Sequence, residues 1–358
     1  MKIFCSIPLL VVLAASLSAA QDAPHEQRSD FRFSLAIIDD LTIDSDLQVP
    51  LPKLLNQALV EPTLTYRYKP DWSFSTSLIG IANRYTDTYS QLRVREAYAG
   101  LSAGDFDFTL GRRIVRWGAG YAFTAIGVLD PPRIPTNPTD RLNVNQGRDM
   151  VKADYVRGAH AFSLAWSSAA LAPAASKLHD TTAFRYNVLV HGFDTSLIAG
   201  DDRGGDAFGG LTFTRVLGEA WEIHGEAAWR EREAILLGAK YTTRSGITFL
   251  GEFFTPPDTP YFQDITLDPL AGRQHYLFVS GGKNRLRELP GWKQWDLSAA
   301  AVANLNDRSF TAIFDANRRL GNHFSTYLHL EIPAGSSQSE YGATPYVAAT
   351  SVGVRFQL

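Results

Sequence analysis

Arginines gather where one β-strand pattern stops, and a group of this kind supplies fixed positive charge. The run FDFTLG alternates between apolar and polar residues, and it is followed by Arg112-Arg113 and then by Arg116-Trp117-Gly118. Guanidinium groups stay charged at any physiological pH, and their field is poorly screened in a narrow, low-dielectric space. The cluster therefore predicts a strong positive field wherever the fold places it.

His323-Phe324-Ser325 is a second candidate for chemistry. Residues two apart on a strand point to the same face, and the His-x-Ser spacing resembles that of the outer-membrane phospholipase A family, in which the histidine activates the serine. The same face continues to Tyr327, His329 and Glu331, and no third residue can be identified that would orient the histidine. We therefore expect no catalysis at this pair.

His224 lies between Glu222 and Glu226, and all three share one face of an alternating run, WEIHGEAAW. Such a set could bind a divalent cation, but a single strand gives poor metal geometry without ligands from its neighbours, so a hydrogen-bonded ladder is favoured. The acidic segment GDDRGGD, residues 200–206, resembles a calcium loop but is expected to be an exposed turn. Motifs for zinc hydrolysis, serine hydrolysis and phosphate binding are missing from the sequence. We expect no catalytic residue, no metal site and no cofactor.

The first twenty residues have the layout of a secretory leader. Lys2 supplies a positive charge, IPLLVVLAASL is an apolar stretch too short to span a bilayer, and SAA precedes Gln21 as a cleavage site. Residues 1–20 are expected to be removed together with the single cysteine, Cys5. The mature chain would then have no thiol, which excludes a disulfide framework and cysteine-based chemistry. A formal net charge of −3 argues against a nucleic-acid partner.

The sequence after the leader is strand-like throughout; TLTYRY, for example, puts Leu64, Tyr66 and Tyr68 on one face. A soluble β-sandwich or propeller and a transmembrane barrel would both show this alternation. The polar faces carry mostly Ser, Thr, Gly, Ala, Asn and scattered Arg, whereas the apolar faces are rich in Tyr, Phe and Trp at strand ends. That distribution is typical of a wall between lipid and an aqueous lumen. Backbone amides in hydrocarbon must pair within the protein, so such a sheet has to close on itself.

The sequence thus predicts an all-β fold, a transmembrane antiparallel β-barrel of about sixteen strands, within a range of about fourteen to eighteen. Its last segment, SVGVRFQL, resembles the C-terminal insertion signal of bacterial outer-membrane barrels, although Leu358 stands where an aromatic residue is usual and Phe356 lies two residues earlier. The barrel is expected over residues 58–358. Residues 21–57, which include a short helix pattern, PLPKLLNQAL, are expected to form either a leading strand plus loop or a small plug in the lumen.

A proline-rich segment over residues 118–148 interrupts the barrel pattern. The prolines of DPPRIPTNP cannot join a strand ladder, and four glycines from Gly111 to Gly127 permit tight backbone conformations. Arg112-Arg113 places consecutive residues on opposite faces, which indicates a β-bulge or the membrane boundary. We predict that this segment folds into the pore as a constriction loop.

Charged residues on the polar faces would then line the pore. Acids from roughly the opposite wall face the basic cluster, and together they predict a transverse field that orients dipolar solutes. The predicted basic pore-lining residues are Arg67, Arg84, Arg93, Arg95, Arg112, Arg113, Arg116 and Arg133, and the acidic ones are Glu222, Glu226 and Glu252. Alternatively, single arginines pair with lumen acids such as Glu96 or bind lipopolysaccharide phosphates at the rim.

The order of motifs in this region carries a family resemblance. Gly-Arg-Arg, then Trp-Gly-x-Gly-Tyr, then the segment DPPRIPTNPTDR resembles a pattern of porin-like outer-membrane barrels related to the alginate-export and capsule-assembly type. The resemblance implies an integral outer-membrane protein that passes or binds small polar solutes or anionic polysaccharide.

These observations favour an outer-membrane channel for passive passage of small hydrophilic solutes that are anionic or dipolar. The alternatives are a barrel for polysaccharide export or surface assembly and, in third place, an outer-membrane lipid hydrolase. The expected partners are outer-membrane lipid and lipopolysaccharide, the barrel-insertion machinery acting through the C-terminal strand, and the solute itself. The expected location is the bacterial outer membrane.

Overall fold

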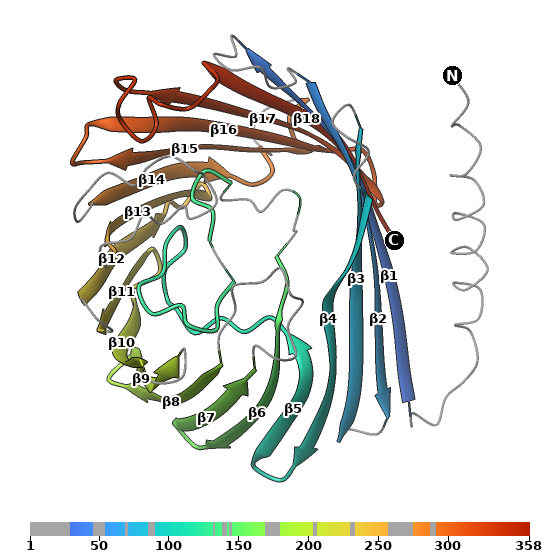
Figure 1. The fold of residues 1–358 in the computed structure, drawn as a ribbon, viewed down its shortest axis with the longest axis vertical. Helices are drawn as coiled ribbons and strands as arrows, with labels where there is room; N and C mark the ends of the chain where they lie inside the picture. The colour runs from blue at the N-terminus through green and yellow to red at the C-terminus, as the bar shows by residue number, and fades with distance from the viewer. Residues whose placement is uncertain are drawn as a thin grey trace.

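The computed structural model describes residues 29–45, 54–68, 71–84, 90–131, 133–137, 142, 145–168, 180–202, 206–229, 233–256, 275–286 and 291–358. The regular structure in these ranges is entirely β (Figure 1). The strands are β1 (Ser29–Ser45), β2 (Leu54–Tyr68), β3 (Trp72–Arg84), β4 (Ser90–Ala103), β5 (Phe106–Arg113), β6 (Arg148–Arg157), β7 (His160–Ser167), β8 (Thr181–Val190), β9 (Phe193–Asp202), β10 (Asp206–Leu217), β11 (Trp221–Trp229), β12 (Glu233–Thr242), β13 (Ile247–Thr255), β14 (Tyr276–Lys283), β15 (Trp295–Asn304), β16 (Ser309–Arg319), β17 (Phe324–Ala334) and β18 (Ala348–Gln357).

The strands form a closed antiparallel barrel. Each strand pairs with its neighbours in sequence, and β1 pairs with β18 from Ala36↔Gln357 to Ser45↔Ala348, which joins the two ends of the 18-stranded sheet. Closure leaves no unpaired sheet edge, which is the condition for a sheet in hydrocarbon. The predicted all-β antiparallel barrel is confirmed, and its strand number lies at the upper limit of the predicted range. No helix in the described ranges is long and apolar enough to cross a membrane.

The start of the barrel differs from the sequence-based expectation. Residues 29–45 form a wall strand, so the leading strand, not a plug, is the alternative found for this part of the N-terminal segment. The short helix predicted at PLPKLLNQAL is wrong, because β2 begins at Leu54 and pairs with β1 from its first residues. From Leu54 the chain pairs with β1 and from Asn56 also with β3, and this ladder overrides the local helix pattern. The barrel therefore begins before residue 58, while the predicted leader, residues 1–20, lies outside the described residues.

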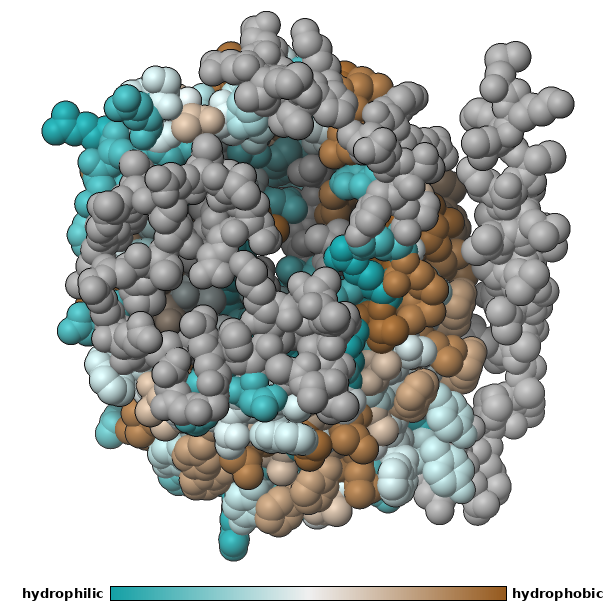
Figure 2. Space-filling view, viewed as in Figure 1, coloured by the Kyte–Doolittle hydropathy of each residue, from teal (hydrophilic) through white to brown (hydrophobic). Residues whose placement is uncertain are grey.

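Alternation along the strands separates an apolar outer face from an inner face. In β7, Leu164 and Trp166 are exposed, whereas Ser163, Ala165 and Ser167 between and beside them are buried. In β18, Val352 and Val354 are likewise exposed. Apolar side chains gather on the outer surface in Figure 2. The outer face is thus the apolar one, as expected of a barrel in lipid.

The two rims of the barrel differ in their connections. At one rim, hereafter the short-turn rim, tight turns such as residues 104–105, 158–159 and 191–192 join successive strands, and β1 begins and β18 ends there. At the other, the long-loop rim, the connections include residues 114–147 and 335–347. In bacterial outer-membrane barrels short turns face the periplasm and longer loops face outward.

Gly111, on β5, is required by its backbone conformation and by its neighbours. Its φ is +119°, and an added Cβ would lie 2.3 Å from the carbonyl oxygen of Ala97 and 2.9 Å from the Cα of Tyr98. Those atoms belong to the paired strand β4 and cannot retreat without disturbing the ladder.

We expect Gly111→Ala to lower the free energy of unfolding by at least about 1 kcal/mol. The measurement is the temperature at which the folded, heat-modifiable band is lost on electrophoresis. Gly209→Ala on β10 is the control, because its Cβ would lie 3.9 Å from the nearest atom, the carbonyl oxygen of Ile198. Equal losses in both variants would contradict this account of Gly111.

Candidate functional site

The described residues of the connection between β5 and β6 lie inside the barrel (Figure 1). The described part of residues 114–147 is called the inner loop below, and it packs first against the wall formed by β6–β10. This cluster comprises Val115, Trp117, Ile126, Val128 and Leu129 of the loop with Met150, Ala165, Ala183, Ile198 and Phe208 of the strands. Burial of these side chains holds the loop inside by the hydrophobic effect. The structure thus has a segment inside the barrel of the kind predicted for a constriction.

The inner loop also reaches two further parts of the wall. Phe123 is fully buried, stacks on Phe254 of β13 at 5.0 Å between ring centroids, and meets Phe278 of β14 edge-on. In the other direction, Leu142 packs against a cluster that includes Ile38 of β1. Contacts with β1 and with β13 place the loop across the interior of the barrel.

Glu226 of β11 holds the inner loop through its backbone. Its carboxylate accepts hydrogen bonds from the N–H groups of Gly120 (2.8 Å), Ala125 (2.6 Å) and Ile126 (3.1 Å), and from the hydroxyl of Thr124 (3.0 Å). The side chain is almost fully buried. Backbone N–H groups buried away from water need acceptors, and a loop without strand partners must find them elsewhere.

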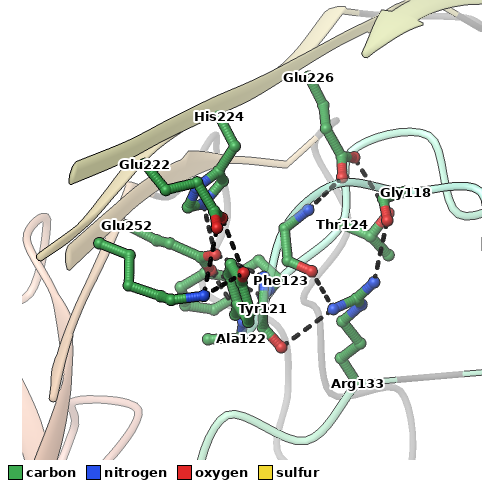
Figure 3. Close-up of polar contacts among 12 residues, drawn as sticks. Gly118, Tyr121, Ala122, Phe123, Thr124, Arg133, Glu222, His224, Glu226 and Glu252 are labelled. Carbon is green, nitrogen blue, oxygen red and sulfur yellow. Dashed lines mark hydrogen bonds and ion pairs between the residues drawn. The ribbon is translucent and has the colours of Figure 1, made fainter. Parts of the chain in front are cut away.

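Glu252 of β13 holds the neighbouring turn of the inner loop in the same way (Figure 3). It accepts hydrogen bonds from the N–H groups of Tyr121, Ala122 (2.8 Å) and Phe123 (3.2 Å), and its Oε1 lies 2.9 Å from Nε2 of His224. Only 1% of this residue is exposed. Hydrogen bonds to an ionised carboxylate are stronger than neutral ones. Two buried carboxylates therefore anchor the loop tip, residues 120–126, to the wall.

Arg133 and Asp130 tie the inner loop to itself. Arg133 donates to the carbonyl oxygens of Gly118, Gly120 and Tyr121, and its guanidinium lies 3.7 Å from the carboxylate of Asp130. Asp130 accepts the N–H groups of Trp117 (2.9 Å) and Gly118 (3.2 Å). Burial raises the pKa of Asp130, against the lowering effect of these amides and of Arg133. Hydrogen bonds and an ion pair thus join the Trp-Gly-x-Gly motif to the proline-rich segment.

Tyr121 stands at the end of the anchored tip and remains 44% exposed. Its hydroxyl donates to Glu222 at 2.7 Å and accepts from Nζ of Lys240 at 2.8 Å, and Lys240 also donates to Glu222 at 3.2 Å. The Tyr121 ring meets the buried ring of His224 edge-on at 5.2 Å. His224 therefore belongs to a hydrogen-bonded ladder with Glu252, the arrangement favoured over a metal site, and no group of potential metal ligands is found in the described residues.

The predicted acidic residues are brought together but are not equally open to the lumen. Glu226 and Glu252 are covered by the inner loop, whereas the Glu222 side chain keeps 18% of its surface exposed beside Lys240. Glu226 and Glu252 were expected to face the arginines across open water, but their carboxylates accept hydrogen bonds from loop N–H groups instead. Whether a transverse field crosses the lumen stays a prediction.

The predicted basic residues fall into three groups. Arg67, Arg93 and Arg116 are exposed, and among the described residues no hydrogen bond or ion pair is found for any of them. Arg95 pairs with Glu61, and it is the residue left over at a register shift, where Ser77 pairs with Glu96 but Leu78 pairs with Val94. Arg113 donates to the hydroxyl of Thr109 at 2.9 Å and lies over the ring of Tyr98. Near Arg112-Arg113 a β-bulge or the membrane boundary was expected: β5 ends at Arg113, and the register shift lies in the β3–β4 pairing.

Two of the predicted pore-lining arginines, Arg112 and Arg133, have other places, and the side chain of Arg84 is not described. Arg112 pairs with Asp149 and shares by register the outer face on which Leu110 is exposed, so it does not stand beside Arg113. Arg133 is used within the inner loop, as described above. Arg84 ends β3 opposite Asn56 in the register, and its side chain is outside what the structure describes. Alternation alone could not place Arg112 and Arg133, because Arg112 lies at a strand end and Arg133 in a loop.

A second loop contributes to the interior and was missed from the sequence. In residues 335–347, Tyr341 is buried in the same cluster as Phe123, and Glu340 accepts hydrogen bonds from Tyr276 (2.9 Å) and Asn304 (2.7 Å). Burial raises the pKa of Glu340. The adjacent pair Glu340-Tyr341 within a run of small residues was the available signal.

Closed antiparallel barrels also form the walls of porins. Solved structures with this architecture match the chain. OccK11 (OpdR) of Pseudomonas aeruginosa is 12% identical, with a TM-score of 0.63 over 92% of this chain and 96% of that one. OpdK of the same organism, determined with vanillate, is 8% identical with a TM-score of 0.63 over 92% and 98%.

A mutant porin of Rhodopseudomonas blastica is 9% identical to the chain, with a TM-score of 0.51 over 92% of this chain and 100% of that one. Identities this low establish the fold alone. No protein-family model matches the sequence, and no curated protein matches it. The expected relation to the alginate-export and capsule-assembly type is not supported, since the matching structures are outer-membrane porins of other types.

The anchoring of the inner loop can be tested with Glu226→Gln, Glu252→Gln and the double variant. Each amide keeps the shape of the carboxylate but loses its charge, and we expect a loss of about 1–3 kcal/mol of loop anchoring for each substitution. Single-channel conductance should rise in the double variant, and protease cleavage within residues 114–147 should become faster.

Glu222→Gln is the matched control, since Glu222 contacts side chains of Tyr121 and Lys240 and no loop amide in the described structure. It should leave the cleavage rate close to that of the wild type. A double variant with wild-type conductance and wild-type protection would show that the carboxylates do not hold the loop.

Proposed function

We propose that the chain is a porin-like channel of the bacterial outer membrane, through which small hydrophilic solutes pass with a preference for anions. The single observation that carries this proposal is the division of the lumen by the inner loop. The loop covers the inner face of β6–β13 and occupies Glu226 and Glu252, whereas exposed arginines remain on β2, β4 and at the start of the loop.

The membrane location is supported by the surface of the barrel. Aromatic and aliphatic side chains are exposed along the outer faces of successive strands, for example Leu110 on β5 and Leu164 on β7. Monomeric soluble proteins rarely expose contiguous apolar surface on this scale. A β-structure can face hydrocarbon only if it closes, and the β1–β18 pairing closes this one.

The anion preference follows from which charges lack a counter-charge. Arg93, Arg116 and Arg67 are exposed without an acidic partner among the described residues, while Arg95 is neutralised by Glu61. A positive field in a narrow passage with low-dielectric walls raises the local concentration of anions. Figure 2 shows a small opening that persists near the middle of the molecule, partly bordered by hydrophilic residues.

The two alternative functions find less support. An exporter would have to thread a polymer past a loop that is anchored to the wall at several places. For the lipid hydrolase, Nδ1 of His323 lies 2.9 Å from the carbonyl oxygen of Gln357, and within the described residues no hydrogen bond joins His323 to Ser325. A serine activated by histidine requires that bond.

Ion currents in planar bilayers test the proposal. Purified protein should give open channels, and the reversal potential in a salt gradient should show anion preference. Arg116→Glu and Arg93→Glu should each lower that preference, and the double variant should lower it further, because each replaces an unpaired positive charge by a negative one.

Arg157→Glu is the control for the charge change itself. Arg157 is exposed at the short-turn rim and shares the outer face with Tyr155, so the reversal potential should stay at the wild-type value. Absence of conductance in the wild type, or equal effects of Arg116→Glu and Arg157→Glu, would refute the proposed channel or its charge preference respectively.

A further inference from the structure

A hollow of about 300 Å³ opens into the inner wall between β2 and β6, at the short-turn half of the barrel. Its lining residues include Arg67 near the end of β2, Ser73 near the start of β3, and Ser102 and Asp107 on either side of the β4–β5 turn. Figure 1 places these strands across the barrel from β11–β13, to which the loop tip is anchored. The hollow therefore does not belong to the loop-anchoring site.

One register row of the sheet builds the floor of this hollow. Arg67 pairs with Ser73, Ser73 with Gly100, Gly100 with Thr109, and Thr109 with Lys152. Side chains directly opposite on neighbouring strands share a face. The row thus presents a cation at each end, two hydroxyl groups, and a gap at Gly100 where no side chain stands.

The positive charges of the hollow are only partly neutralised. Lys152 is paired with Asp154, but Arg67 is exposed and finds no partner in the described residues. Arg113 has the hydroxyl of Thr109 and the ring of Tyr98 as its neighbours, with no carboxylate among the described contacts. Two guanidinium groups are therefore available to an anion, and guanidinium matches carboxylate and phosphate oxygens through paired N–H donors.

Most of the remaining lining is polar, beside Tyr98, Leu101 and Phe108, and suits a ligand that carries hydroxyl groups. Hydroxyls of Thr65, Ser73, Ser75 and Thr109 line the hollow together with two carboxylates, those of Asp107 and Asp154. Ser102 donates to Asp107, and Ser163 donates to Asp154 at 2.6 Å. A carboxylate has about four lone-pair sites, so both acids can accept further hydroxyl donors. The volume lies at the lower end of the range for small-ligand pockets, about 300–1,000 Å³.

We propose that this hollow is a binding subsite for a small hydroxylated oxoanion, such as a sugar acid or a sugar phosphate, on the path of the channel. The anionic end binds Arg67, Arg113 adds positive charge beside Thr109, and the hydroxyl groups bind the Ser, Thr and Asp side chains of the lining. The inference rests on the proposed channel function and deepens it by naming a solute class.

Calorimetry on the folded protein in detergent tests the inference, with gluconate, glucose 6-phosphate, acetate, inorganic phosphate and glucose as probes. Gluconate or glucose 6-phosphate should bind about tenfold or more tightly than the matching simple anion, acetate or phosphate, and than uncharged glucose. Comparing the affinities of gluconate and glucose 6-phosphate shows whether the subsite prefers a carboxylate or a phosphate. Acetate and phosphate binding as tightly as their hydroxylated counterparts would overturn the hydroxyl part of the inference.

Two variants locate the binding. Arg67→Gln should weaken the tighter probe about tenfold by removing one charge. Gly100→Ala should weaken it as well, because the added methyl group would lie 2.6 Å from Oγ of Ser73 and would displace that hydroxyl into the hollow. Gly80→Ala on the neighbouring β3 is the matched control, since its Cβ meets only the carbonyl oxygen of Val60 at 3.7 Å, and binding should not change.

The same preparations, inserted in planar bilayers, separate the two proposals. Wild-type protein that conducts ions but binds none of the probes, or an Arg67→Gln variant that conducts and binds like the wild type, would overturn the subsite while leaving the channel in place. Wild-type protein that gives no current would overturn the channel itself. Retained conductance in each variant also shows that the variant has folded.

Discussion

The inner loop can exist inside the barrel only because its backbone N–H groups find acceptors there. Wall strands satisfy their amides with one another, but residues 120–126 have no strand partner. Glu226 and Glu252 supply the acceptors, each taking three loop amides, and both side chains are almost fully buried. A buried carboxylate needs donors as much as the amides need an acceptor. The hydrogen bonds between carboxylates and loop amides thus offset the desolvation penalty of both partners, and they determine the position of the loop.

The same hydrogen bonds also affect the electrostatic character of the lumen. If the acids of β11 and β13 faced water, they would balance the arginines of β2 and β4 across the barrel. Covered by the loop, they act through short hydrogen bonds, and Glu222 is held by Lys240. In the proposed channel, the arginines without an acidic partner among the described residues, Arg93 and Arg116 among them, set the sign of the field. In that proposal one segment, the inner loop, determines both the shape and the charge of the passage.

The sequence predicted the wall better than the contents of the lumen. Alternation in runs such as HAFSLAWS depends on the two faces of a strand, which is a local property, and the structure has the faces as predicted. The place of Arg95 depends on how β3 pairs with β4, and no local pattern encodes that register shift. Alternation put Glu226 and Glu252 on a polar face, but their burial depends on loop residues about one hundred positions earlier. The proline-rich composition indicated a constriction loop without indicating its acceptors.

The distance along the chain between the loop and its anchors imposes an order on assembly. The inner loop follows β5, yet its acceptors belong to β11 and β13, and the seam is closed only by the final strand, β18, against β1. During synthesis and export the loop precedes its partners by many residues, so its amides must stay hydrated until those strands arrive. Contacts this remote in sequence form late in folding, because chain entropy is lost before they contribute. The inner loop can therefore reach its final position only when the barrel wall is complete. In a partly folded barrel its position is not yet fixed.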